Sequence, residues 1–187
     1  GKFLGEFQGD DKILVVTKSG DYHICNFDLS NHFPTDLLLI EKFDLNKVWS
    51  AALYDADQKY AYLKRFTFEA SDKSLNFLGE HPDSKLFVLT DVVFPRMKAI
   101  FGGNDDFRDP LEIDVDEFIA VKGFRAKGKR ISNFEIQTVE ELEPIKFPEE
   151  PKEDQSTKVE IEEDNGDEGI SDSDLRDEIT GQMKLFD

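Results

Sequence analysis

Residues 10–27 read DDKILVVTKSGDYHICNF, and this stretch decides the fold class. Two short runs rich in Val, Ile and Tyr, at residues 13–17 and 22–26, are separated by the polar turn Lys-Ser-Gly-Asp. Short runs of this composition with a glycine-containing turn between them are typical of antiparallel strands. The stretch therefore predicts a pair of strands rather than a helix.

The same pattern continues along the chain to residue 136. Further strand-like runs occupy residues 48–54, 60–68, 86–90, 118–124 and 130–136, and turn sequences such as DADQ, HPDS and GGNDD separate them. The stretch 28–47 differs, because Pro34, Thr35 and Asp36 favour the start of a short helix there. Short strands at this regular spacing predict an all-β sandwich, barrel or propeller-like array.

Internal repetition favours the array. The sequence FLGE at residues 3–6 recurs at residues 77–80, and each copy precedes a polar turn and a strand that ends in Thr. The stretches 57–69 and 116–132 are expected to form further hairpins that start with an acidic turn. Roughly four hairpins result, and because none can bury its apolar face alone, we expect them to stack as blades.

The charge divides the chain into two parts. The net charge of the chain is −18, and residues 148–187 carry −11 of it. The first part of this segment has almost no large apolar side chains, so burial cannot offset its ordering entropy. We therefore expect a folded domain over residues 1–147, with about three to four blade units, and a disordered acidic tail over residues 148–187. Ser171-Asp172-Ser173-Asp174 predicts the start of a short helix inside the tail.

Several classes of site are excluded by composition. Cys25 is the single cysteine, which excludes an internal disulfide and favours a reducing, cytoplasmic location. No apolar run approaches the length of a membrane-spanning helix. His23, His32 and His81 lack the spacing of a zinc site, and no phosphate-binding glycine loop or nucleophile motif is present. We expect a chain that is itself non-catalytic, with no metal and no cofactor.

The acidic turn, the run ILVVT and the exit strand of residues 10–27 resemble blades of the C-terminal domain of bacterial type IIA topoisomerase A subunits, the gyrase A-like family. YLKRFTFE (62–69) and VKGFRAKGKRISNFEI (121–136) are similar in particular to the topoisomerase IV A subunit of Bacteroidetes-type bacteria. The resemblance covers residues 2–147 and the final GQMKLFD. It implies a β-pinwheel, a propeller-like ring of four-stranded blades that binds and bends DNA around its outer rim.

The departures from this family are informative. The box QRRGGKG of gyrase A subunits is absent, which favours the topoisomerase IV branch or a fragment without the blade that carries the box. The folded part is too short for a whole ring, so we expect a partial β-pinwheel. The resemblance also implies that the catalytic tyrosine, Mg, ATP, the topoisomerase IV B subunit and the second A subunit belong to the rest of an ATP-dependent holoenzyme.

The basic run is the main candidate for DNA contact. Between Glu117 and Glu135 there are five cations and no acid: Lys122, Arg125, Lys127, Lys129 and Arg130. Cations in this density position a duplex through its phosphates without reading sequence, whereas the alternative is a solvated loop. Lys64 and Arg65 are further candidates, but strand alternation places them on opposite faces, so only one of them shares a face with the rim. Arg96 and Lys98 are weaker candidates.

The tail carries two open questions. It is either a solubilising linker or a tethered polyanion that competes with DNA for the basic rim. Its terminal residues Gln182, Met183, Leu185 and Phe186 resemble the peptide by which replication proteins dock on the sliding clamp. The alternative is that Leu185 and Phe186 fold back onto the domain.

The sequence thus predicts the non-catalytic C-terminal domain of a topoisomerase IV A subunit, which holds double-stranded DNA and presents it to a catalytic core located elsewhere. The rival prediction is a propeller-like protein-interaction module with no DNA role. Basic side chains gathered together favour the first, and an exposed apolar groove favours the second.

Overall fold

The computed structural model describes residues 3–28 and 30–150. Gly1–Glu149 forms one compact unit, and the following account concerns that unit. The predicted acidic tail, its short helix and the terminal peptide with Gln182, Met183, Leu185 and Phe186 lie almost wholly outside the described residues. Within the described part, no helix has both the length and the apolar character needed to cross a membrane.

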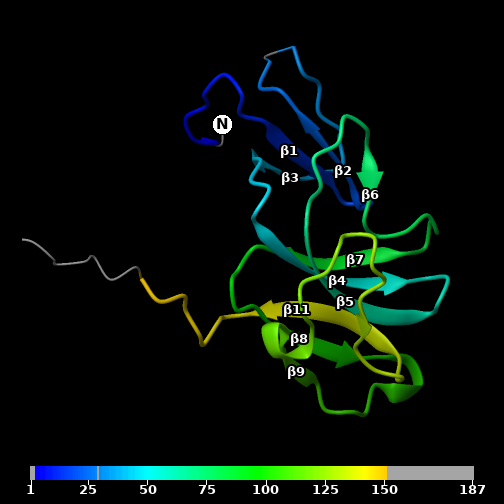
Figure 1. Cartoon of the computed structure of the whole chain (residues 1–187). Helices are drawn as coiled ribbons and strands as arrows, with labels where there is room; N and C mark the ends of the chain where they lie inside the picture. Colours follow the sequence, from blue (N-terminus) through cyan, green and yellow to red (C-terminus); the bar gives the residue numbers. More distant parts are fainter. Residues whose placement is uncertain (1–2, 29, 151–187) are drawn as a thin grey trace, which may run out of the picture. The chain divides into compact units, whose positions relative to one another are not determined.

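Three antiparallel sheets make up the unit (Figure 1). Sheet A has the order β3 (Leu37–Lys42), β1 (Ile13–Thr17), β2 (Asp21–Cys25) and β6 (Leu75–Asn76). Sheet B has the order β10 (Lys129–Arg130), β5 (Tyr60–Thr67), β4 (Val48–Asp55) and β7 (Lys85–Thr90). Sheet C has the order β11 (Ile136–Leu142), β8 (Arg96–Phe101) and β9 (Leu111–Asp114). Two single turns of helix, η1 (Gly103–Asp105) and α1 (Val115–Phe118), complete the described elements.

The sheets are linked by exchanged strands. β6 lies in the chain between β5 and β7 of sheet B, yet it pairs with β2 of sheet A. β10 lies between β9 and β11 of sheet C, yet it pairs with β5 of sheet B. Each of the first two sheets is therefore completed by a strand that the chain supplies on its way through the next sheet. No closed barrel forms among the described strands, and the predicted all-β, partial β-pinwheel of antiparallel blades is confirmed.

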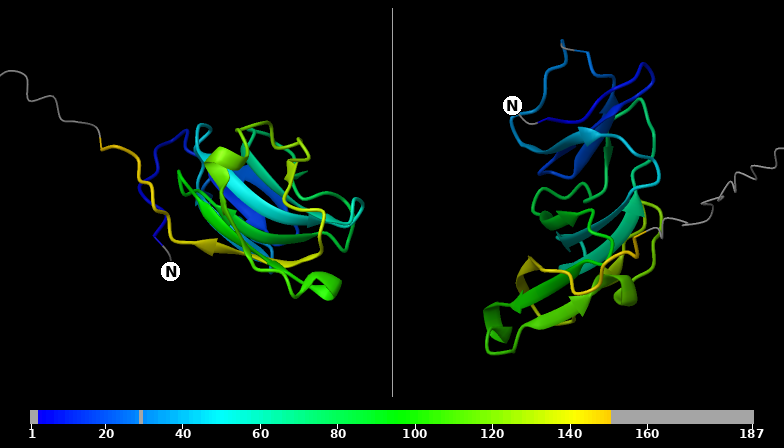
Figure 2. Two further views of the ribbon diagram at one scale, coloured as in Figure 1. Left: turned by 90° about the horizontal axis from the view of Figure 1, so that it is seen from below. Right: turned by 90° about the vertical axis from the view of Figure 1, so that its left-hand side faces the viewer.

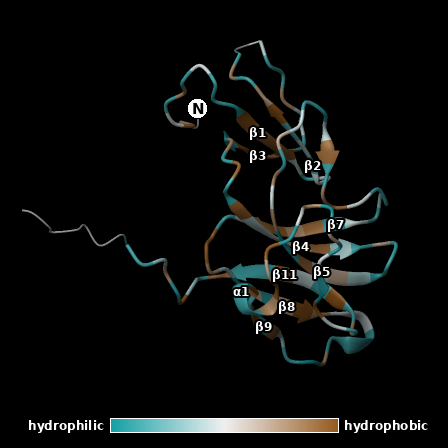
Figure 3. Cartoon of the chain, viewed as in Figure 1, coloured by the Kyte–Doolittle hydropathy of each residue, from teal (hydrophilic) through white to brown (hydrophobic). Residues whose placement is uncertain are grey.

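The hydrophobic core lies between the sheets. One cluster joins Leu14 and Tyr22 of sheet A to Trp49 and Phe66 of sheet B. A second cluster joins sheets B and C and contains Leu63, Val88, Met97, Ile113 and Val139. β4 contributes to both clusters, because Ala51 belongs to the first and Ala52 to the second. Figure 3 shows the corresponding hydrophobic colour along β4 and β7, in contrast to the hydrophilic end of β11.

Three local predictions are wrong, and one is the strand at residues 130–136, where residues 131–135 form the connection between β10 and β11. The expected helix within residues 28–47 is absent, and Leu37–Lys42 forms β3, which pairs with the free edge of β1. The spacing of apolar residues in so short a run fits a strand as well as a helix. Here the run forms a strand because it can pair with the free edge of β1. Residues 118–124 form no strand, because Phe118 ends α1 and the chain then crosses from sheet C to sheet B.

The prediction that the stretches 57–69 and 116–132 each form a hairpin is also wrong. The hairpins are β1–β2, β4–β5 and β8–β9, so the stretch 57–69 supplies one turn and one strand. The stretch 116–132 contains the crossover to β10 and no hairpin of its own. The two FLGE copies share one backbone feature, a positive φ at Gly5 (99°) and Gly79 (115°), but Phe3 is 82% exposed whereas Phe77 is 2% exposed, so the copies pack differently. Glycine is the residue that adopts this conformation without steric cost.

Candidate nucleic-acid interface

The segment of residues 122–130, here called the basic loop, follows α1 in the chain and ends with the two residues of β10. The Lys122 amide donates a hydrogen bond to the Arg65 carbonyl (2.8 Å) at one end of the loop. Beyond the other end, the Ile131 amide donates to the Ala61 carbonyl (2.9 Å). Both anchors lie on β5, so the loop is attached to the same strand at two points. In Figure 2 the yellow-green part of the chain, which contains the loop, runs beside the cyan strands of sheet B.

Two residues inside the loop fix its course. The Phe124 ring is 2% exposed and packs edge-on against Tyr22, with ring centroids 5.5 Å apart. Gly128 has a φ of 89°, and a Cβ atom there would collide with the Leu63 carbonyl oxygen. The loop therefore lies close against sheet B, and its polar residues are left to face solvent.

All five predicted cations of the loop are exposed: Lys122, Arg125, Lys127, Lys129 and Arg130. None of them pairs with a carboxylate in residues 3–28 or 30–150, although nine ion pairs form elsewhere in that part of the chain. The loop therefore offers an anionic surface positive charge that no direct ion pair neutralises.

Two of these cations are held over aromatic rings. The Lys129 ammonium lies 4.4 Å from the centroid of the Phe118 ring and donates to the Phe118 carbonyl (3.2 Å). The Arg130 guanidinium lies 3.8 Å from the centroid of the Tyr60 ring and donates to the Asn133 side-chain oxygen (3.0 Å). Cation–π contacts of this kind restrict the side chains while leaving the charge exposed. The sequence does not point to Tyr60 or Phe118, because the contact of Arg130 with Tyr60 depends on the pairing of β10 with β5, two strands distant in the chain.

The structure places Lys64 away from the surface. Its side chain is buried, and the ammonium donates to the Phe77 carbonyl (2.7 Å) and to the Phe124 carbonyl. Burial lowers the pKa of Lys64 from 10.5 to about 8, against the opposing effect of Asp55. Lys64 thus holds the crossover that follows β6 and the basic loop together, and it does not present its charge to solvent.

Arg65 is only partly accessible. Its side chain is half-buried, one guanidinium nitrogen lies 3.5 Å from the Ile119 carbonyl oxygen, and its Nε is buried without a partner among the described residues. The two cations of this pair do face opposite sides of β5, as alternation requires. Neither is exposed as the loop cations are.

A family model for the topoisomerase C-terminal domain of Bacteroidota matches residues 1–143. The chain belongs to this family. No curated protein and no solved structure matches this topoisomerase C-terminal domain. The predicted membership in a bacterial topoisomerase C-terminal domain is therefore confirmed on the family model alone.

Arg96 and Lys98, the weaker candidates for DNA contact in this topoisomerase C-terminal domain, form ion pairs within the domain. Arg96 bonds Glu112 (2.8 Å) and Asp114 (3.3 Å), and Lys98 pairs with Glu140 (3.4 Å). These pairs neutralise the cations along sheet C. In the described part of the domain, no cluster of three or more His, Cys, Asp or Glu side chains is arranged to hold a metal ion.

Acidic residues of the domain approach the basic loop at one place. A cavity of about 330 Å³ is lined by Asp55 and Asp57 of the β4–β5 turn and by Arg125 and Lys127 of the loop. These carboxylates reduce the local positive potential at that end of the loop. Lys122, Lys129 and Arg130 do not line this cavity.

Proposed function

We propose that this domain binds double-stranded DNA through the basic loop without reading its sequence. The observation that carries the proposal is a loop of five exposed cations, anchored at both ends on β5, with no carboxylate partner in the described part of the chain. Lysine and arginine side chains in such an arrangement replace the counterions of the phosphate backbone. The proposal leaves out Lys64, whose charge is buried.

The acidity of the domain is compatible with this role. Residues 1–147 carry a net charge of −7, which opposes long-range attraction of DNA. Contacts within a Debye length of about 8–10 Å respond instead to local charge, and the loop is locally basic. We therefore expect modest affinity that falls steeply with salt.

The wider role follows from the family. We propose that the chain is part of a topoisomerase IV A subunit and presents bound DNA segments to the catalytic core for strand passage. The gyrase box QRRGGKG does not occur in residues 1–187, as expected for this assignment or for a fragment without the blade that carries the box. In this proposal the partners within the complete enzyme are the topoisomerase IV B subunit and a second A subunit, its location is the bacterial cytoplasm at the nucleoid, and the terminal QMKLF peptide is a candidate ligand of the sliding clamp.

A salt series tests DNA binding by the loop. Fluorescence anisotropy of the full chain with a random-sequence duplex is measured for wild type and for a triple variant in which Lys122, Arg125 and Lys127 are replaced by Gln. Each lost phosphate contact reduces the slope of log affinity against log salt by about 0.9. A matched triple variant replaces the exposed Lys12, Lys18 and Lys73 by Gln, and its slope should stay near that of wild type. Equal slopes in the two variants would contradict the proposal and favour a protein-interaction module.

A further inference from the structure

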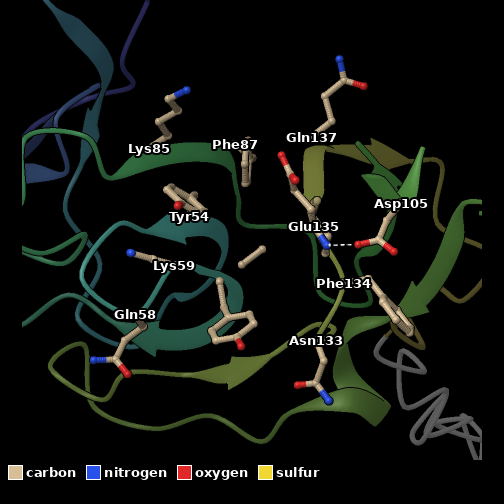
Figure 4. Close-up of a pocket in the computed structure, with 13 residues that line it drawn as sticks. Tyr54, Gln58, Lys59, Lys85, Phe87, Asp105, Asn133, Phe134, Glu135 and Gln137 are labelled. Carbon is tan, nitrogen blue, oxygen red and sulfur yellow. Dashed lines mark hydrogen bonds between the residues drawn. The ribbon is translucent and has the colours of Figure 1, made fainter. Parts of the chain in front are cut away.

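A cleft of about 770 Å³ lies where sheets B and C meet, beside the basic loop. Figure 4 shows Tyr54, Lys59 and Lys85 on one side of the cleft, and Asn133, Phe134 and Glu135 on the other. This volume lies within the range of about 300–1,000 Å³ that is usual for pockets that hold small ligands. The cleft is therefore large enough to admit a nucleotide.

Stacked arginines stand beside two of the aromatic rings that line the cleft. Arg130 lies 3.8 Å from the centroid of the Tyr60 ring, and Arg108 lies 3.3 Å from the centroid of the Phe134 ring. Arg130 is fixed by its hydrogen bond to Asn133, and Arg108 by its ion pair with Asp105 (2.9 Å). Aromatic rings and guanidinium planes are the surfaces on which unpaired bases stack in single-stranded nucleic acids.

The charge around the cleft favours an anionic ligand. Of the cations that line the cleft, Lys59 and Lys85 have no carboxylate partner in the part of the chain that the structure describes, and the lining acid Asp105 is neutralised by Arg108. Glu135 is the remaining acid of the cleft lining. Unpaired positive charges in the cleft lining therefore outnumber the one unpaired carboxylate.

The backbone at Lys59 provides a separate observation. Its φ is 63°, in the left-handed region, and it is the one non-glycine residue of the described chain with a positive φ. Its amide donates to the Asp55 carbonyl (2.7 Å), which closes the β4–β5 turn. Such a conformation costs on the order of 1 kcal/mol or more, and strain of this kind is concentrated at ligand sites and switch regions. The turn thus keeps a lysine at the cleft where a glycine would be less strained.

We propose that this cleft binds an unpaired nucleotide of single-stranded DNA, with its base against the aromatic rings of the lining, which the two arginines hold in place, and its phosphate near Lys59 and Lys85. The proposal builds on the proposed function, because Arg130 belongs to both the basic loop and the cleft border. A duplex held on the loop keeps its bases stacked inside the helix, so only a strand that has left its partner can place a base in the cleft.

The test uses fluorescein-labelled (dT)12 and a duplex of the same length, with the full chain and anisotropy as the readout. The cleft variant combines Lys85→Ala and Phe134→Ala, both at exposed positions. The control variant combines Lys73→Ala and Phe3→Ala, which removes one exposed lysine and one exposed ring elsewhere. We expect the cleft variant to lose affinity for (dT)12 by about 5- to 100-fold, the effect of one stacked base. Duplex affinity should change by less than about twofold, since Phe134 and Lys85 lie outside the basic loop.

A second measurement guards against misfolding of the cleft variant. A 2-aminopurine base placed within the (dT)12 strand should lose fluorescence on binding to wild type, because stacking on the ring quenches it, and Lys85→Ala alone should retain this quenching. Equal (dT)12 affinity in the cleft and control variants would overturn the proposal, as would a parallel loss of duplex and single-strand binding. Wild type that binds (dT)12 but no duplex would overturn the proposed function and leave the cleft assignment standing.

Discussion

The buried ammonium of Lys64 makes a specific prediction about stability and pH. The pKa of Lys64 is about 8 in the folded chain, whereas its ordinary value is 10.5. Between these two pH values the unfolded chain binds more protons than the folded chain, so the free energy of unfolding rises as pH increases. One unit of pKa difference corresponds to about 1.4 kcal/mol, so the gain is about 3 kcal/mol across this window.

The measurement is urea unfolding of wild type and of Lys64→Met at several pH values from 7 to 10.5, followed by subtraction of the two curves. Subtraction removes the titration of other lysines and tyrosines. The difference should move in favour of wild type by about 3 kcal/mol over this range. The neutral amine still donates to the carbonyls of Phe77 and Phe124, so these bonds persist as the charge is lost. Lys85→Met, at an exposed lysine, is the matched control. A flat difference for Lys64→Met would refute the assignment of a desolvated charge at this position.

Two further predictions concern the course of the basic loop. Gly128→Ala should lower the free energy of unfolding by about 1–3 kcal/mol, because of its left-handed backbone and the collision with Leu63, whereas Gly123→Ala, with open space around it, should change it by less than about 1 kcal/mol in the same urea titration. Phe124→Ala should cost about 3–5 kcal/mol and also weaken duplex binding in anisotropy, since it removes a buried anchor of the loop. Unchanged stability in either Gly128→Ala or Phe124→Ala would contradict the packing described here.

The strands of the β1–β2 and β4–β5 hairpins and β7 are predicted from sequence, whereas β8 and β9 of the third hairpin and the exchanged strands are not. β1, β2, β4, β5 and β7 coincide closely with apolar or alternating runs bounded by turn residues. β6 and β10 are only two residues long, so they carry no periodicity, and their partners are distant in the chain. These two strands form because the edges of β2 and β5 are free to accept a partner, and local composition does not show this.

For the candidate site too, features set by local sequence could be predicted, and contacts between distant segments could not. The density of cations between Glu117 and Glu135 is a local property, and the structure places all five on the surface. Alternation correctly places Lys64 and Arg65 on opposite faces of β5, but it does not say which face is covered by a neighbouring sheet. The cleft unites Lys59 and Lys85 with Phe134, residues that only the contact of two sheets brings together.

The double attachment of the basic loop to β5 has a mechanical consequence. If the loop binds DNA as proposed, a pulling force on that DNA would be transmitted to β5 at both Arg65 and Ala61. β5 lies inside sheet B, between β4 and β10, and its apolar side chains pack toward both neighbouring sheets. The two attachments make the loop a rigid connection and not a hinged one, so tension in a duplex bound as proposed would pass directly to the central strands of the domain.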